Sequence, residues 1–411
     1  MPYTIALVSD FFLPAVGGVE VHIYSLGIEL QRLGHKVIVI THSHPPERVG
    51  IRYLAPTNLK VYHLPIAVLT ASATLPQYLT FLPYLRNIII REQIEILHGH
   101  ATLSSLAHEA MFHAAFFDLP LRQGRRNGKA RQGIRTVFTD HSLFELDSAV
   151  GVLTNKLLAG ALRNADAVIC VSHAGRENTS LRAQLDPHLV YVIPNSIVPR
   201  KFTPNPALAD RSCSGDGPKM VELEQMREMH LLQDRIELLG SVPPGQVGNV
   251  LNRGQIYLST SLTEAFGTSI IEAASTGLFI VSTKVGGVPE ILPEDMIEFA
   301  RPDADDIINA LRRAIGIIRS GRHDPLTAHE RLKDMYSWAA IAERTERVYD
   351  RVLQAEDRSL FERMARLLDL GLFYGPILCI ITAVQGIFLT VLDRFQPRGL
   401  IDVVPDVHPQ D

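Results

Sequence analysis

Short apolar runs alternate with stretches of helical periodicity from the first residues onward. Thr4–Val8 and Lys36–Thr41 have the composition of buried strands. Between them lies a helical pattern, Val19–Leu33, which stops at Gly34, where a helix C-cap belongs. The alternation continues through strands at Ile94–His98, Thr136–Thr139 and Ala167–Val171 to a strand at Val190–Ile193. It predicts an α/β fold with a parallel sheet covered on both faces, which binds ligands at the carboxyl ends of its strands.

A loop-rich stretch after Pro194 divides this pattern in two. Beyond the stretch the alternation resumes with a helix at Lys219–His230 and finishes with a helix that ends at Leu353. We therefore expect two Rossmann-like domains, residues 1–195 and 196–353, facing each other across a cleft.

Composition excludes several classes of protein. The chain has 40 Lys and Arg against 44 Asp and Glu, a balance that argues against a nucleic-acid binder. Its three cysteines are far apart, so neither a disulfide framework nor a structural zinc site is expected. His98-Gly-His100 lacks the further ligands that zinc needs, and Asp303-Ala-Asp305 opens a helix, where capping is the better interpretation.

The C-terminal region carries a membrane signal. Residues 370–392 contain no charged side chain and, as a helix, extend over roughly 34 Å, enough to cross a bilayer. Residues 354–369 read as a basic amphipathic helix on the cytosolic leaflet. We expect one crossing with 393–411 as a short lumenal tail; the alternative is a buried helix or an interfacial hairpin. The first residues lack the pattern of a signal peptide, so we expect the bulk of the chain in the cytosol.

Two glycine loops follow predicted strands. Gly17 and Gly18, with Glu20 just after them, lie before the first helix, where glycines let backbone N–H groups approach a ligand. The loop is not the G-x-G-x-x-G of dinucleotide-binding proteins, and a plain tight turn is an equal alternative. Gly286 and Gly287 follow a later strand and could hold a phosphate or a sugar in the same way.

Two glutamates enclose a third loop. Glu264 follows the predicted strand Ile256–Thr260, and Glu272 lies eight residues later on the next helix. Carboxylates accept hydrogen bonds from sugar or ribose hydroxyls, while the amides at a helix N-terminus attract an anion. The intervening residues that face this site are Phe266, Gly267 and Thr268.

One histidine stands at a strand end in the same way. His141 follows a strand in the run Thr139-Asp140-His141-Ser142, where it could donate a hydrogen bond to a bound sugar. The alternative is a histidine with its hydrogen bonds satisfied in a turn.

These stretches resemble a known family. VSDFFLPAVGGVEVHIYSL, TDHSLF, SLTEAFGTSIIEAASTG and VSTKVGGVPEILP are similar to retaining glycosyltransferases of the two-Rossmann GT-B fold with an E-x7-E motif. Within them, the chain resembles the catalytic subunits of phosphatidylinositol N-acetylglucosaminyltransferase over nearly its whole length. The resemblance implies transfer of GlcNAc from UDP-GlcNAc to phosphatidylinositol, with retention, in the first step of GPI-anchor biosynthesis.

The resemblance also assigns roles. His141 contacts the donor sugar, Glu264 holds sugar hydroxyls and Glu272 holds the ribose. It implies no metal and no cofactor, an endoplasmic reticulum membrane location, and partner subunits in a complex.

The chain departs from the family in two places. The family follows its domain linker with a strand, an Arg- and Lys-bearing loop that clamps the donor diphosphate, a helix and another strand. Only 18 residues separate Ser196 from Gly215 here, with no counterpart of that loop. We interpret Arg200 and Lys201 as linker residues, and the second domain as truncated. The other departure is a basic insertion, residues 118–133, which is a solvated loop or a translated intron.

Three functions remain open. The leading one is the transfer of GlcNAc to phosphatidylinositol. The others are a catalytically dead or mis-spliced membrane-anchored variant of the same protein, and another GT-B lipid glycosyltransferase, such as a phosphatidylinositol mannosyltransferase.

Overall fold

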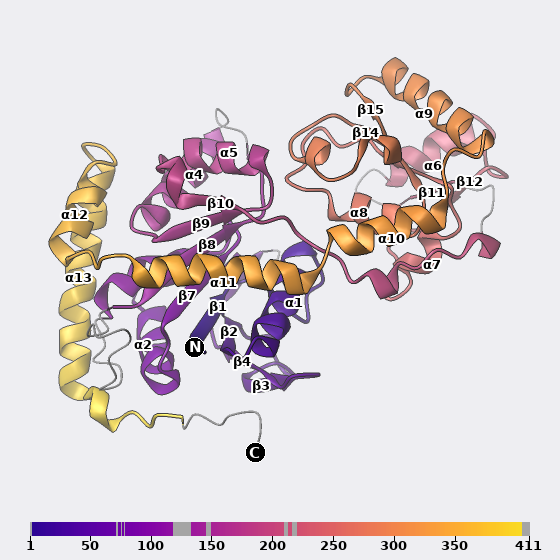
Figure 1. Ribbon diagram of the computed structural model, residues 1–411. Helices are drawn as coiled ribbons and strands as arrows, with labels where there is room; N and C mark the ends of the chain where they lie inside the picture. Colours follow the sequence, from indigo (N-terminus) through magenta and orange to yellow (C-terminus); the bar gives the residue numbers. More distant parts are fainter. Residues whose placement is uncertain are drawn as a thin grey trace. The chain divides into compact units, whose positions relative to one another are not determined.

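The computed structural model describes residues 2–70, 73–74, 76–77, 79–117, 133–144, 149–208, 213–215 and 220–404. Contacts divide the chain into two compact units (Figure 1). Unit 1 comprises Met1–Pro194 and Ala339–Asp411, and unit 2 comprises Asn195–Trp338. The helix α11 (Trp338–Gln354) therefore packs with unit 1, whereas the sequence division assigned it to the second domain. The predicted insertion 118–133 lies outside the described residues except for Gly133.

Unit 1 is built on one eight-stranded sheet, which confirms the predicted α/β class. Its strand order is β10-β9-β8-β7-β1-β2-β4-β3. All neighbours pair in parallel except β3 and β4, which are antiparallel. In this order the strands are β10 (Val190–Val192), β9 (Ala167–Cys170), β8 (Arg135–Asp140), β7 (Ile96–His100), β1 (Thr4–Val8), β2 (Lys36–His42), β4 (Leu59–Leu64) and β3 (Gly50–Leu54). A small hairpin, β5 (Val68–Thr70) and β6 (Ala73–Thr74), stands apart from the sheet.

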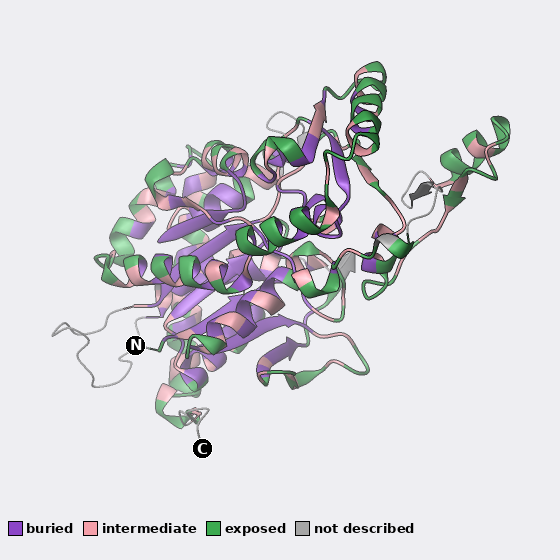
Figure 2. Ribbon diagram, turned by 45° about the vertical axis from the view of Figure 1, so that its right-hand side comes forward, coloured by how far each residue is buried: buried purple, intermediate pink, exposed green. Residues whose placement is uncertain are grey.

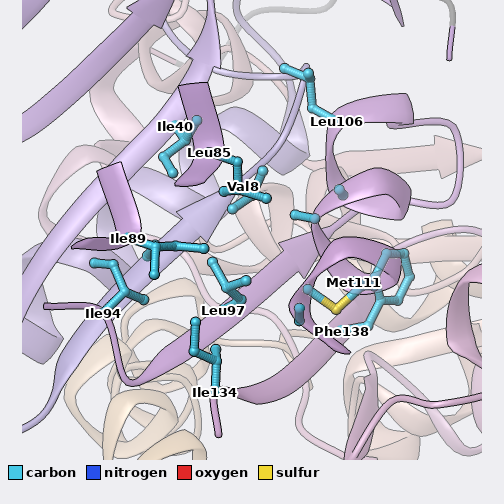
Figure 3. Close-up of a cluster of buried hydrophobic side chains, with 14 of the residues drawn as sticks. Val8, Ile40, Leu85, Ile89, Ile94, Leu97, Leu106, Met111, Ile134 and Phe138 are labelled. Carbon is cyan, nitrogen blue, oxygen red and sulfur yellow. The ribbon is translucent and has the colours of Figure 1, made fainter. Parts of the chain in front are cut away.

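Helices cover this sheet, and the central strands are buried on both faces, as parallel strands must be (Figure 2). The helices are α1 (Gly18–Arg32), α2 (Phe81–Glu92), α3 (Ser105–His113), α4 (Ala149–Leu162), α5 (His173–Ala183) and α11. Figure 3 shows how one face is filled: Val8, Ile40 and Leu97 from the strands meet Leu85 and Ile89 of α2. All five side chains are fully buried, so this cluster fixes the strands whose carboxyl ends carry the candidate site.

Unit 2 contains two smaller sheets. β13 (Ile256–Ser259), β14 (Phe279–Thr283) and β15 (Ile297–Ala300) are parallel, and β11 (Cys213–Gly215) pairs with β12 (Ile236–Leu238) as a separate sheet. Its helices are α6 (Met220–Met229), α7 (Val247–Leu251), α8 (Thr268–Ser275), α9 (Ala304–Arg319) and α10 (Pro325–Met335). α6 buries none of its residues and leaves Val221, Met226 and Met229 exposed.

Two C-terminal helices, α12 (Leu360–Leu368) and α13 (Tyr374–Phe395), lie side by side along unit 1 (Figure 1). Of the helices in the described ranges, α13 alone is long and apolar enough to cross a membrane. Its buried stripe comprises Gly375, Leu378, Thr382, Gln385 and Leu389. A second stripe is exposed and mostly apolar, with Thr390 and Arg394 beside it near the end of the helix. Its apolar members are Ile377, Ile380, Val384, Ile387, Val391 and Phe395.

Both ends of α13 are docked on unit 1. Near its start, Leu378 packs against Ala159 of α4 in a small apolar cluster. Near its end, Asp393 pairs with the fully buried Arg86 of α2, and Gln396 O accepts a hydrogen bond of 2.7 Å from Arg86 Nη2. One side of the helix therefore faces protein along its whole length while the other side remains apolar and uncovered.

Candidate functional site

Three histidines meet at the carboxyl edge of the unit 1 sheet. His100 ends β7, His141 follows β8, and His22 lies on α1, the helix that follows β1. Because β1, β7 and β8 are neighbours in the sheet, their ends bring these side chains together. Nδ1 of His100 lies 3.4 Å from Nε2 of His141, and the rings of His22 and His141 are 4.6 Å apart, edge to face.

The rings of His98, His100 and His141 are kept uncharged. Burial lowers the pKa of His98, His100 and His141 well below the usual value, and the neighbouring imidazoles lower it further. A neutral imidazole carries one N–H and one lone pair, so it can donate to, or accept from, a sugar hydroxyl without leaving a fixed charge in the site.

The same group is the candidate metal-ligating set of the described chain. His22, His100 and His141 each offer a nitrogen, and these atoms lie within 4.8 Å of one another. A zinc-binding imidazole normally donates its other N–H to a carboxylate or a carbonyl. Nε2 of His100 and Nδ1 of His141 have no hydrogen-bond partner among the described residues, so that support is missing. The expectation of no metal stays a prediction.

Asp140 fixes the segment that carries His141. Its Oδ1 accepts hydrogen bonds from Thr102 Oγ1 at 2.7 Å and from the Ser142 N–H at 3.2 Å. Its Oδ2 accepts one of 2.8 Å from Thr179 Oγ1 and lies 3.4 Å from Arg182 Nη1. The residues on both sides of His141 are thus held by the fold, which positions the imidazole.

Asp10 is a buried carboxyl at the end of β1 that the sequence interpretation did not single out. Its two oxygens accept hydrogen bonds from Thr74 Oγ1 at 2.9 Å and from the Ser105 N–H at 2.7 Å. Burial raises its pKa to about 6, although these hydrogen bonds act in the opposite direction. Asp10 links the β1 loop to the first turn of α3.

The predicted glycine loop starts α1. Gly17 is the N-cap, and Glu20, in the first turn, is buried. A Cβ on Gly17 would lie 2.5 Å from Glu20 Oε2, whereas one on Gly18 would meet nothing within 4 Å. Gly17 is thus needed for the close approach of the Glu20 carboxylate, and Gly18 leaves open space at the helix N-terminus, where backbone N–H groups are available to a ligand.

Unit 2 brings its two predicted loops together. Glu264 O accepts a hydrogen bond of 3.0 Å from the Gly287 N–H, and Glu264 Oε1 accepts one of 3.1 Å from the Gly267 N–H. Gly267 has φ 88° and Gly286 has φ 50°, both in the left-handed region that favours glycine. Thr268 then opens α8, while Phe266 is buried against Tyr336, with their rings 6.1 Å apart.

The carboxyl group of Glu272, on α8, has a raised pKa. Burial raises its pKa to about 7, and the charge of Lys201 lowers it in part. Lys201, which we interpreted as a linker residue, therefore acts on the second glutamate of the E-x7-E motif. Burial also raises the pKa of Tyr257, where the charges of Glu272 and Glu264 add to the effect.

The predicted residues thus form two groups. Unit 1 holds Gly17, Gly18, Glu20 and His141, and unit 2 holds Glu264, Phe266, Gly267, Thr268, Glu272, Gly286 and Gly287. Sequence reasoning missed Asp10 and His22, and it considered His100 only beside His98, as an incomplete zinc site. Their only sequence signal was a polar residue at or just after a strand, or in the first turns of the helix that follows.

Family models match both units. The model described as Glycosyltransferase Family 4 matches residues 16–201, and the one described as Glycosyl transferases group 1 matches residues 213–316. The chain is 43% identical to the phosphatidylinositol N-acetylglucosaminyltransferase gpi3 subunit of Schizosaccharomyces pombe, over 97% of this chain and 92% of that protein. It belongs to this family.

Other members are similar at comparable length. The phosphatidylinositol N-acetylglucosaminyltransferase subunits of Arabidopsis thaliana and Homo sapiens are each 40% identical to this chain. The Arabidopsis protein matches 98% of this chain over 94% of its own length, and the human protein matches 98% over 88%. The alignment with the S. pombe protein runs over 436 positions. This chain has 411 residues, so that alignment includes positions with no residue in this chain.

Solved structures show the GT-B fold. Sucrose-phosphate synthase from Thermosynechococcus elongatus has a TM-score of 0.68 at 19% identity, covering 86% of this chain and 100% of its own. WaaG, a glycosyltransferase of lipopolysaccharide biosynthesis, has a TM-score of 0.55 at 12% identity, covering 83% and 98%. This chain therefore has the GT-B fold, with a Rossmann-like parallel sheet in each unit; in unit 2 that sheet is β13-β14-β15.

Proposed function

We propose that this chain transfers GlcNAc from UDP-GlcNAc to phosphatidylinositol, the first step of GPI-anchor biosynthesis. The observation that carries the proposal is 43% identity with a named subunit of that transferase over 97% of the chain. Both glycine loops, both glutamates and His141 lie within the stretches that the two family models match. The relatives are named as subunits, so we include partner subunits in the proposal.

In the proposed reaction, the C1–O bond between GlcNAc and the diphosphate breaks and UDP leaves. A bond forms between C1 and an inositol oxygen on the same face, which retains the configuration. The proton of the inositol hydroxyl goes to the leaving diphosphate. His141 donates to the donor sugar, Glu264 accepts from its hydroxyls, and Glu272 accepts from the ribose. Lys201 lies near enough to Glu272 to shift its pKa, so it is the described cation that we place beside the donor.

A catalytically inactive variant of this protein is the second candidate. Two observations favour it: the positions of the S. pombe alignment that this chain lacks, and the structure of unit 2. There β11 and β12 form a sheet of their own, and α6 buries none of its residues. A loop that clamps the diphosphate would supply electrostatic stabilisation of the leaving group, usually a large part of catalysis.

We place the chain on the endoplasmic reticulum membrane, attached through α12 and α13. The predicted crossing at 370–392 would place the end of α13 on the lumenal side of the membrane, whereas an interfacial hairpin would keep it on the cytosolic side. The contacts of both ends of α13 with unit 1 support the hairpin, because a helix that crossed the bilayer would carry Asp393 away from Arg86. The apolar stripe from Ile377 to Phe395 then faces the lipid.

The test is transfer by the full chain in membranes of cells that lack their own catalytic subunit. With radiolabelled UDP-GlcNAc we expect a chloroform-soluble product that a phosphatidylinositol-specific phospholipase cleaves. Labelling from GDP-mannose instead would identify a mannosyltransferase. Assembly with the other subunits without product would identify the inactive variant.

A further inference from the structure

A small cavity, with a volume of about 100 Å³, lies in unit 1 between α3, α4 and α13. Thr102 and Ser105 line it from the loop and first turn after β7, and Leu157 and Gly160 line it from α4. Tyr374 and Leu378 close it from α13. Its volume is below that of an ordinary small-molecule site, and the greater part of its lining is apolar.

The two ends of the cavity differ in chemistry. At one end Thr102 donates to Asp140, the residue before His141, and the Ser105 N–H donates to Asp10. At the other end Leu378 belongs to the apolar cluster that joins α13 to α4. A molecule in this cavity would thus have a polar end beside the carboxyl edge of the sheet and an apolar end beside α13.

α13 connects the cavity to the surface that we place in lipid. Leu378 faces the cavity, and Ile377 and Ile380, its neighbours along the helix, begin the exposed apolar stripe. Gly160 permits this close packing, because a Cβ there would lie 2.4 Å from Tyr374 Oη and 3.0 Å from Leu378 Cδ1. Leu157 and Leu103 in the lining are partly exposed, so the cavity has an open side.

We infer that this cavity binds a segment of one acyl chain of the acceptor glycerophospholipid and so directs its headgroup to the sheet edge at His141. The inference rests on the proposed function for the identity of the lipid. An acyl chain gains free energy from each methylene that it buries, and it can pass from the lipid beside α13 without crossing water.

The test uses two substitutions that fill the cavity from different elements, Leu157→Trp on α4 and Leu103→Trp on the β7–α3 loop. Both positions are exposed enough to accept a larger side chain without repacking the core. The matched control is Val152→Trp, on the exposed face of α4 and outside the lining. The probe is phosphatidylinositol with a photoactivatable diazirine in one acyl chain, added to membranes that hold the full chain and its partners.

We expect cross-links on α3, α4 and α13 around the cavity. Both filling variants should reduce them by about tenfold, which corresponds to roughly 1.4 kcal/mol of binding, and the control should not. Cross-links confined to the exposed stripe of α13, unchanged in both variants, would overturn the inference. This readout does not need turnover, so it separates the inference from the proposed function, which fails if the wild type makes no GlcNAc lipid.

A kinetic measurement supplies the second readout. Each filling variant should raise KM for long-chain phosphatidylinositol by about tenfold and leave the rate with glycerophosphoinositol, which has no acyl chain, unchanged. An equal loss with both acceptors would show general damage to the domain and would count against the cavity.

Discussion

Arg86 Nη2 lies 2.6 Å from Asp393 Oδ1, and this ion pair joins α2 to the last turn of α13. The Arg86 side chain is fully buried, and its Nε donates a second hydrogen bond to the same oxygen at 2.8 Å. A buried guanidinium that lost its partner would be strongly destabilised, so the contact keeps the end of α13 on the side of the membrane where α2 lies.

This contact predicts the topology of the C-terminus. A protease-cleavable tag added after Asp411 should be cut in sealed microsomes without detergent, because the tail remains on the cytosolic side. A lumenal reporter in the same microsomes serves as the control and must remain intact. Protection of the tag until detergent is added would show instead the crossing predicted from the sequence.

The position of His141 predicts its contribution to transfer. His141→Ala should lower kcat by about a hundredfold or more, because a preorganised donor to the reacting sugar is lost. Thermal unfolding of the variant, measured in parallel, separates a loss of catalysis from a loss of folding. His188→Ala, at an exposed position, is the control. Equal kcat values for the two variants would remove His141 from the catalytic group.

Glu272 predicts how donor binding depends on pH. Its pKa of about 7 lies above the usual value, so the carboxylate that accepts ribose hydroxyls prevails above pH 7 and the protonated acid prevails below it. KM for UDP-GlcNAc should therefore fall as pH rises, by about tenfold between pH 6 and pH 8.

Two variants test this assignment. Glu272→Gln should give a weak and pH-independent KM, whereas Glu330→Gln, at an exposed position, should keep the wild-type profile. Lys201→Ala should move the midpoint to higher pH, because the Lys201 charge lowers the pKa of Glu272. A profile in Glu272→Gln identical to wild type would assign the titration to another group.

The sequence predicts the parallel core of unit 1 well because β1, β2 and β9 are built on continuous apolar runs. It misses β3, whose residues are mostly exposed at the antiparallel edge of the sheet, so no apolar pattern marks it. It also places the β7 strand at Ile94–His98, two residues too early. The structure continues β7 to His100, because the backbone stays paired with β8 as far as Thr139. Tyr349 and Thr139 contact the two nitrogens of the buried His98, at 2.7 Å each, so a polar side chain is accommodated inside the strand.

The group of His22, His100 and His141 could not be predicted from local sequence patterns. His100 and His141 are 41 residues apart, and only the strand order makes them neighbours. By contrast, Asp303 accepts hydrogen bonds from the N–H groups of Asp305 and Asp306 as the N-cap of α9, so the capping interpretation is confirmed. Capping depends on the next few residues alone, which is why the sequence sufficed.

The backbone conformation of Gly267 predicts that replacing it will lower the stability of unit 2. Its φ of 88° is costly for a residue with a Cβ, and that atom would lie 3.0 Å from Ile270 Cδ1 and 3.3 Å from Ile291 Cδ1. Gly267→Ala should therefore destabilise unit 2 by about 1–2 kcal/mol and raise KM for UDP-GlcNAc, because the turn positions Glu264.

Gly316→Ala provides the control within the same unit. Gly316 lies inside α9, three residues before its end, and a Cβ there meets nothing within 4 Å, so alanine should stabilise the unit by about 0.5–1 kcal/mol. Thermal unfolding of the two variants should shift in opposite directions. A shift of both to lower temperature would mean that crowding, rather than backbone conformation, decides the effect at Gly267.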